Sequence, residues 1–252
     1  MSSPNPAAQA LTRTTAGVVA LGALILAGAM HAAGLVTATG PAFIAGAVLP
    51  YAVGGLLVVT QVARHNPHVT FGAANLVTLF RLILTSLVAG FAVEILLTHI
   101  APSDASLWGA FLVAFIASAL DGVDGLLARR QATSSAFGSR FDMETDAFLI
   151  LMLSVAVFAL GKAGDWVLLS GLLRYVFVAA GWIWPALAAP LPPSWRRKVV
   201  CVLQTGGLIL PLAPVTDPPI GALIAFAGLV LLVYSFAVDV LWSLRAGTPQ
   251  LS

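Results

Sequence analysis

Long apolar stretches, separated by short turn-forming segments, make up most of this chain. Eight stretches approach or exceed the roughly 20 residues that an α-helix needs to cross a bilayer. The separators are rich in glycine and proline, as in TATGP and APLPPS. The pattern therefore predicts a bundle of about eight transmembrane helices. The predicted spans are 15–36, 41–63, 74–98, 105–128, 139–160, 166–190, 197–213 and 218–244.

The composition supports an all-α integral membrane protein. Of the 252 residues, 60% are hydrophobic and only 9% are charged, whereas soluble domains carry about 25% charged residues. The apolar stretches are also much longer than the roughly 10-residue strands of a membrane barrel. A single cysteine, Cys201, excludes an intrachain disulfide, and a net charge of +2 gives no indication of nucleic-acid binding.

The first span has two interpretations. A basic residue, Arg13, followed by an apolar run and small residues, resembles a signal peptide. The apolar run is longer than such a signal needs, so we favour a retained membrane anchor. The predicted topology is the same in either case.

The basic residues predict the orientation in the membrane. Lysine and arginine are enriched on the cytoplasmic side of membrane proteins. If the N-terminus is cytoplasmic, nine basic residues lie at cytoplasmic helix ends and only Lys162 lies opposite. Both termini and the segment 121–146 are then cytoplasmic, as expected in a bacterial-type inner membrane. The nine residues are Arg13, Arg64, Arg129, Arg130, Arg140, Arg196, Arg197, Lys198 and Arg245.

Half of the acidic residues lie between positions 121 and 146, at the ends of two apolar spans. Asp121 and Asp124 are three residues apart, and Asp142 and Asp146 are four apart, so each pair shares one helix face. A short link joins the two helices and can bring the pairs together. Carboxylates at membrane depth are costly, and divalent cations would neutralise them. An all-oxygen site suits Mg²⁺, Mn²⁺ or Ca²⁺ better than zinc.

Glycine and arginine residues accompany the acidic residues. Gly125 and Gly138 share their helix faces, where a missing side chain lets a ligand approach the backbone closely. Arg129 lies one turn beyond Gly125 and can bind phosphate. This combination of acidic residues, an expected metal, glycines and an arginine predicts a site for a phosphate-bearing substrate.

The same residues carry a resemblance to a known family. The run Asp121-x2-Asp124-Gly125-x2-Ala128-Arg129-x8-Gly138-x3-Asp142-x3-Asp146 resembles the signature of the CDP-alcohol phosphotransferases at every fixed position. The segment Asn75-x2-Thr78-x2-Arg81 is similar to the one that opens the first core helix of that family. The resemblance implies a six-helix catalytic core at 72–252, preceded at 1–71 by a tail and two additional helices.

The resemblance also implies a reaction and roles for individual residues. A phospho-alcohol group moves from a CDP-linked donor to an acceptor hydroxyl, and CMP is released. Two divalent cations, Mg²⁺ or Mn²⁺, are expected at the donor pyrophosphate. Asp146 is also expected to act as the general base. The metal ligands implied are Asp121, Asp124, Asp142 and Asp146, and the nucleotide-binding residues are Gly125, Ala128, Arg129 and Gly138.

Seven further residues are candidates for contacts with the acceptor or with phosphate. Arg81 lies close enough to a helix end to reach water, but its place in the Asn75 segment favours a role in the site. Arg174 lies deeper, and either a functional role or pairing with Glu94 or another acid explains it. The basic run at 196–198 fits a phosphorylated acceptor or, more simply, a contact with anionic lipid. The seven candidates are Asn75, Thr78, Arg81, Arg174, Arg196, Arg197 and Lys198.

The substrates and the protein class leave alternatives open. We favour CDP-diacylglycerol as the donor and a small polar alcohol as the acceptor, with glycerol 3-phosphate, inositol phosphate and serine as candidates. A CDP-linked head group with a lipid alcohol is the reverse arrangement. A magnesium-dependent membrane prenyltransferase is one alternative class, but its aspartate motifs have a different spacing. A transporter is another, but its ion-coupling acids would be expected near the bilayer centre. Glycine pairs such as Gly54-Gly55 and Gly206-Gly207 permit tight helix contacts, as in a homodimer within membrane lipids.

Overall fold

The part of the chain described by a computed structural model is entirely helical. It comprises residues 6–36, 39–66, 68, 70–131, 135–184, 191–192 and 194–246, without the side chains of 36, 123–131 and 245–246. Eight α-helices and two short 3₁₀ helices occur in these ranges, with no β-strand. The α-helices are α1 (Pro6–Val36), α2 (Pro41–His65), α3 (Ala73–Thr98), α4 (Asp104–Gln131), α5 (Ala136–Ala159), α6 (Leu168–Ile183), α7 (Trp195–Ile209) and α8 (Pro218–Ala246). The 3₁₀ helices are η1 (Asp165–Val167) and η3 (Leu210–Leu212).

Each predicted span corresponds to one α-helix, but two ends differ clearly from the prediction. α1 begins at Pro6, nine residues before the predicted start at 15. Proline is favoured in the first turn of a helix, and the alanines that follow it are strong helix formers. α6 ends at Ile183, seven residues before the predicted end at 190. Pro185 follows closely, and the residue before a proline is disfavoured in helical conformation.

Six of the eight helices are long and apolar enough to cross a membrane. The exceptions are α5 and α7. Every 18-residue window of α5 contains Asp142, Glu144 and Asp146, and α7 has only 15 residues and begins with a basic run. The all-helical membrane architecture is therefore confirmed, whereas the predicted count of eight spans is not.

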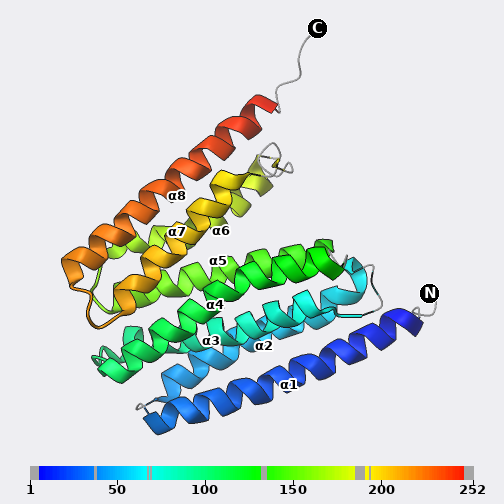
Figure 1. Ribbon diagram of the computed structural model, residues 1–252, viewed down its shortest axis with the longest axis horizontal. Coiled ribbons are helices and arrows are strands. Elements are labelled where there is room, and N and C mark those ends of the chain that lie inside the picture. The colour runs from blue at the N-terminus through cyan, green and yellow to red at the C-terminus, as the bar shows by residue number, and fades with distance from the viewer. Residues whose placement is uncertain are drawn as a thin grey trace.

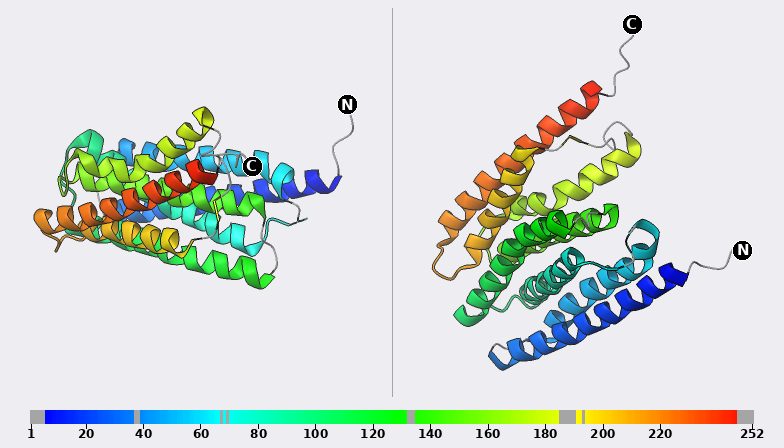
Figure 2. Two further views of the ribbon diagram at one scale, coloured as in Figure 1. Left: turned by 90° about the horizontal axis from the view of Figure 1, so that it is seen from above. Right: turned by 45° about the vertical axis from the view of Figure 1, so that its right-hand side comes forward.

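α3 lies at the centre of the bundle. It packs against α1, α2, α4 and α5, and 72% of its most apolar window is buried, against 11% for α1. α1 and α2 lie along one flank, and α7 and α8 lie along the opposite flank (Figures 1 and 2). Successive helices alternate in direction, so the N- and C-terminal ends of the bundle point toward the same side (Figure 1).

A carboxylate from α3 fixes the start of α2. The two oxygens of Glu94 accept hydrogen bonds from the backbone N–H groups of Gly40, at 3.0 Å, and Phe43, at 2.6 Å. The first N–H groups of a helix lack partners within the helix and carry partial positive charge. An acid at the far end of α3 therefore caps α2 and ties the two helices together.

α1 is joined to α2 by a tyrosine. The Tyr51 hydroxyl donates a 2.7 Å hydrogen bond to the backbone carbonyl of Val19. The ring belongs to an apolar cluster that includes Leu26 and Ala47. This contact and the Glu94 cap connect the two N-terminal helices to the rest of the bundle.

Candidate functional site

The centre of the site is a buried arginine on α3. Arg81 is only 1% exposed, and its Nε donates a 3.1 Å hydrogen bond to the carbonyl of Ala117 on α4. Its Nη1 donates to Asp142 and lies 3.4 Å from Asp121 Oδ1, and its Nη2 donates to Asp146. We call these four residues, Arg81, Asp121, Asp142 and Asp146, the Arg81 cluster.

The three carboxylates of the Arg81 cluster converge from two helices. Asp121 lies in the second half of α4, and Asp142 and Asp146 lie one turn apart in the first half of α5. One oxygen from each lies within 4.8 Å of the others. The predicted convergence is therefore confirmed for these three residues.

The cluster is closed on one side and open on the other. The exposed side-chain fraction is 40% for Asp121, 34% for Asp142 and 25% for Asp146, and it falls to 1% for Arg81. Arg81 is thus the buried member of the cluster, and the three carboxylates keep partial exposure.

The donor set fits a hard divalent cation. Three half-buried carboxylates offer only oxygen ligands, which Mg²⁺ and Mn²⁺ prefer. They outnumber the one guanidinium in the cluster, so the formal charge of its four described residues is negative. The excess favours a divalent cation over an anion at this position.

Four predicted site residues lie outside the described side chains. They follow Asp121 on the same helix, and the backbone of α4 is helical as far as Gln131. The four are Asp124, Gly125, Ala128 and Arg129.

Gly138 faces another predicted site residue. A Cβ at Gly138 would lie 2.7 Å from Oδ1 of Asn75. The Gly138 N–H donates to Oγ of Ser135, the residue that caps α5, and the Asn75 side chain donates to the carbonyl of Phe71. Gly138 therefore leaves room for Asn75, and its predicted role in binding the nucleotide stays a prediction.

Gly72, the residue before α3, has a backbone conformation that favours glycine. Gly72 has φ of 79°, a region that side chains disfavour. This turn places Asn75 beside Gly138. Thr78, one turn later, is buried and donates a 3.1 Å hydrogen bond to the carbonyl of Ala74 in its own helix.

Arg174 pairs with an acid that the sequence did not single out as its partner. Its Nη2 contacts Glu144 on α5, not Glu94, which caps α2. Of the two interpretations of Arg174, pairing with Glu94 or another acid is the one observed, and the acid is Glu144. Glu144 is offset from Asp142 and Asp146 on the helix surface, so Arg174 approaches α5 on a different face from Arg81.

The basic run at the start of α7 is also paired. Arg196 Nη2 lies 2.5 Å and Arg197 Nη1 lies 3.2 Å from Oδ1 of Asp239 on α8. Arg196 also donates to the carbonyl and hydroxyl of Ser235. We call Arg196, Arg197 and Asp239 the Asp239 cluster. Lys198, beside it, is exposed.

α7 packs against both α4 and α5. Its Cys201 is partly buried and packs against the apolar cluster that includes Leu149 and Leu153. The sequence assigned Cys201 to plain helix packing, and the structure agrees.

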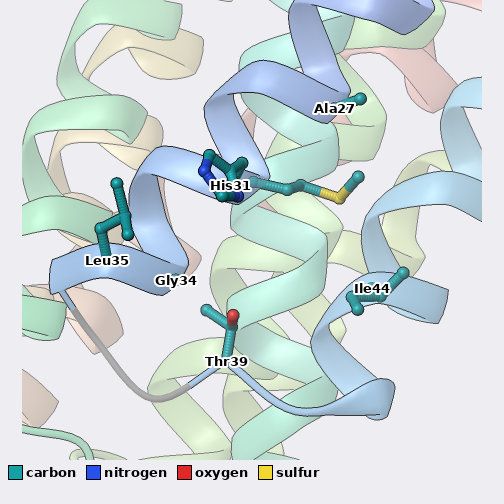
Figure 3. A pocket seen from close by; sticks show the side chains of 7 residues that line it. Ala27, His31, Gly34, Leu35, Thr39 and Ile44 are labelled. Carbon is teal, nitrogen blue, oxygen red and sulfur yellow. The ribbon is translucent and has the colours of Figure 1, made fainter.

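A separate hollow of about 410 Å³ lies between the end of α1 and the start of α2 (Figure 3). None of its lining residues is acidic, and it is adjacent to the start of α2 that Glu94 caps. It is therefore distinct from the Arg81 cluster, which lies near the other end of α3. The lining residues are Ala27, Met30, His31, Gly34, Leu35, Thr39 and Ile44.

Comparisons with known proteins agree with the site geometry. No curated protein matches the chain, and no solved structure does. A family model described as CDP-alcohol phosphatidyltransferase matches residues 71–238. That range contains the whole Arg81 cluster and two thirds of the chain, and it omits α1 and α2. The chain therefore belongs to the CDP-alcohol phosphatidyltransferase family.

Proposed function

We propose that this protein makes a phospholipid by moving a phosphatidyl group from CDP-diacylglycerol to the hydroxyl of a small polar acceptor. The family implies phosphatidyl transfer from a CDP-alcohol. The observation that carries the proposal is the convergence of three carboxylates from α4 and α5 within 4.8 Å. The same family match argues against a prenyltransferase or a transporter.

The acidic residues are proposed to hold two divalent cations, Mg²⁺ or Mn²⁺. Asp121, Asp142 and Asp146 supply converging oxygens, and Asp124, three residues after Asp121, is proposed as the fourth ligand. Such ions would neutralise the pyrophosphate of the donor and polarise its phosphorus. The carboxylates would then orient the donor at the open side of the cluster.

Asp146 is proposed to act as the general base. It is the deepest of the three described carboxylates, with the smallest exposed fraction, so a bound acceptor can be shielded from water beside it. The acceptor O–H gives its proton to the Asp146 carboxylate, and the acceptor oxygen forms a bond to the phosphatidyl phosphorus. The bond from that phosphorus to the bridging oxygen breaks, and CMP leaves with the electron pair.

The remaining roles follow from the family signature and from charge. Gly125, Ala128 and Arg129 are proposed to line the cytidine diphosphate site on α4. Gly138 would contribute by letting Asn75 pack close to the start of α5. Asn75 and Thr78 would then support the site through helix packing.

An acceptor with a phosphate or carboxylate would be attracted to the positive charge around α7. The Asp239 cluster has two guanidinium groups and one carboxylate, and exposed Lys198 adds a further charge. Arg174, paired with half-exposed Glu144, is a second candidate. This proposal favours glycerol 3-phosphate or inositol phosphate over serine.

The active site is proposed to face the cytoplasm of a bacterial-type inner membrane. The basic residues favour this side, and both ends of the chain would lie there. Residues 72–252 would form the catalytic core, and residues 1–71 an added pair of helices. A homodimer within the membrane lipids is the assembly to test.

Release of CMP by purified protein in detergent tests the proposed function. The assay uses CDP-diacylglycerol, Mg²⁺ or Mn²⁺, and a panel of acceptors, with Asp146→Asn as the inactive variant. Asp104→Asn is the matched control, because Asp104 is an exposed aspartate at the opposite end of α4. We expect metal-dependent CMP release with one acceptor, reduced about 100- to 10,000-fold in Asp146→Asn and retained in Asp104→Asn.

The outcomes separate the donor type from the family chemistry. Failure with every acceptor, from folded protein, would redirect the test to a CDP-linked head group and a lipid alcohol. Failure with both donor types would contradict the proposed reaction. Full activity of Asp146→Asn would exclude Asp146 as the base while leaving the reaction itself intact.

A further inference from the structure

Arg81 places a positive charge at the position where the proposed function requires metal cations. It is 1% exposed and lies on the most buried of the six candidate spans. Its described ion-pair partners, Asp121, Asp142 and Asp146, are the proposed metal ligands. A role in plain membrane anchoring is excluded, because the guanidinium points into the bundle and does not reach the surface.

We infer that Arg81 is a resident counter-cation that assembles the acidic site without metal and lowers its affinity for divalent cations. The inference rests on the proposed metal site. Arg81 is a positioning residue in this scheme, since it acts on the carboxylates and not on the reacting atoms.

The fork shape of the guanidinium explains how one residue can assemble the site. Nε is fixed to the Ala117 carbonyl on α4 at 3.1 Å, while Nη1 and Nη2 donate to Asp142 and Asp146 on α5. One planar group therefore connects three helices in a defined register. A lysine carries the same charge but lacks this fork.

Charge balance explains the effect on metal affinity. Without Arg81, the three described carboxylates would repel one another. With Arg81, part of that repulsion is already compensated, and an incoming cation is repelled by the nearby guanidinium. At distances of about 4 Å, such interactions are large even near a protein surface. Arg81 therefore holds the carboxylates together in the metal-free state and weakens the affinity of the site for metal.

The experiment measures metal binding and stability, with no dependence on activity. Protein in detergent is stripped with EDTA and titrated with Mn²⁺, and free Mn²⁺ is followed by electron paramagnetic resonance. Thermal unfolding is recorded with and without Mn²⁺. The variants are Arg81→Met, which removes the charge, and Arg81→Lys, which keeps the charge and removes the fork. Arg174→Met is the control, because Arg174 also pairs with an acid on α5, but outside the Arg81 cluster.

We expect Arg81→Met to bind Mn²⁺ at least roughly tenfold more tightly than the wild type. Its stripped form should unfold about 5 °C or more below the wild type, and Mn²⁺ should restore most of the difference. Arg81→Lys should show a lower unfolding temperature when stripped, with an Mn²⁺ affinity within about threefold of the wild type. Arg174→Met should change neither quantity appreciably, because its Glu144 partner is 56% exposed.

Unchanged or weaker Mn²⁺ binding by folded Arg81→Met would overturn the inference. If Arg81→Met does not fold when stripped, Arg81→Lys decides. An unfolding temperature below the wild type that Mn²⁺ restores supports the inference, and one equal to the wild type contradicts it. If the wild type neither binds Mn²⁺ nor releases CMP, the proposed function fails. The stripped variants then still test whether Arg81 holds the carboxylates together.

Discussion

The Arg81 cluster and the Asp239 cluster contain the same two functional groups in opposite proportions. In the first, one guanidinium contacts three carboxylates from α4 and α5. In the second, one carboxylate on α8 contacts two guanidinium groups from α7. The first has excess negative charge and suits cations, whereas the second has excess positive charge and suits anions. The ratio of the groups, more than their presence, decides what each position can bind.

Burial also differs between the two clusters. Arg81 is 1% exposed, whereas Arg196 is 24% and Arg197 is 30% exposed. Removing one partner from a buried ion pair is costly because the remaining charge cannot reach water. Breaking the Arg81 cluster should therefore affect both stability and metal binding, and breaking the Asp239 cluster should affect stability without changing metal binding.

The largest effect is expected from Asp142→Asn. It removes one of three converging oxygens and leaves the cluster with less negative charge. Loss of a group that only supports a metal ligand weakens metal affinity or activity by about 10- to 100-fold, so loss of a ligand should lower CMP release by at least about 100-fold. The assay of CMP release, together with Mn²⁺ titration, measures this. Retention of wild-type Mn²⁺ affinity would remove Asp142 from the proposed ligand set.

The second prediction concerns Asp239→Asn. Two partly exposed arginines would lose their charged partner, and we expect a loss of about 1–3 kcal/mol in the free energy of unfolding. Mn²⁺ affinity should remain at the wild-type value, because the Asp239 cluster is not part of the proposed metal site. Denaturation in detergent and Mn²⁺ titration measure the two quantities. A change in Mn²⁺ affinity without a loss of stability would contradict the separation of the two clusters.

The third prediction concerns the packing that supports the Arg81 cluster. Gly138→Ala places a Cβ 2.7 Å from Oδ1 of Asn75, and overpacking of this kind destabilises by about 1–3 kcal/mol. The double variant with Asn75→Ala should lose less than the sum of the two single variants, because the clash is relieved. Thermal unfolding of all three proteins measures the coupling. Simple additivity would show that the two residues do not restrict one another.

The smallest effect is expected from Glu94→Gln, which changes a carboxylate held by backbone N–H groups and not by arginine. The amide keeps one acceptor oxygen but loses the charge that favours the start of α2. We expect a loss of about 0.5–2 kcal/mol in stability, with CMP release retained. Thermal unfolding measures the loss of stability, with Asp104→Asn as the control. Equal loss in both variants would indicate a general charge effect and not a helix cap.

Much of the site could be predicted because its pattern is local. A spacing of four residues places Asp142 and Asp146 on one face of any helix, and a short link between two helices brings Asp121 near them. The family signature depends on the same spacing, so it too was visible in the sequence. The all-helical class followed from long apolar stretches.

Other features could not be predicted because they join distant parts of the chain. The family resemblance favoured a role for Arg81 in the site, but its contacts followed from no spacing rule, because it is 61 residues from Asp142 and 65 from Asp146. The same holds for Arg174 with Glu144 and for Glu94 with Gly40, which lie 30 and 54 residues apart. The predicted count of eight membrane spans stays a prediction, because α5 combines an apolar end with an acidic one and α7 has only 15 residues.

The sequence by itself therefore determined the helical membrane class, the family and the shared helix face of Asp142 and Asp146. These features depend on the length of apolar stretches and on helical periodicity, which are local properties of the chain. Only the tertiary structure decided which aspartates Arg81 contacts, that Asn75 occupies the space beside Gly138, and that Asp239 pairs with the basic run. Those contacts depend on how α3 packs against its neighbours and α7 against α8, because the partners meet only when whole helices are brought together.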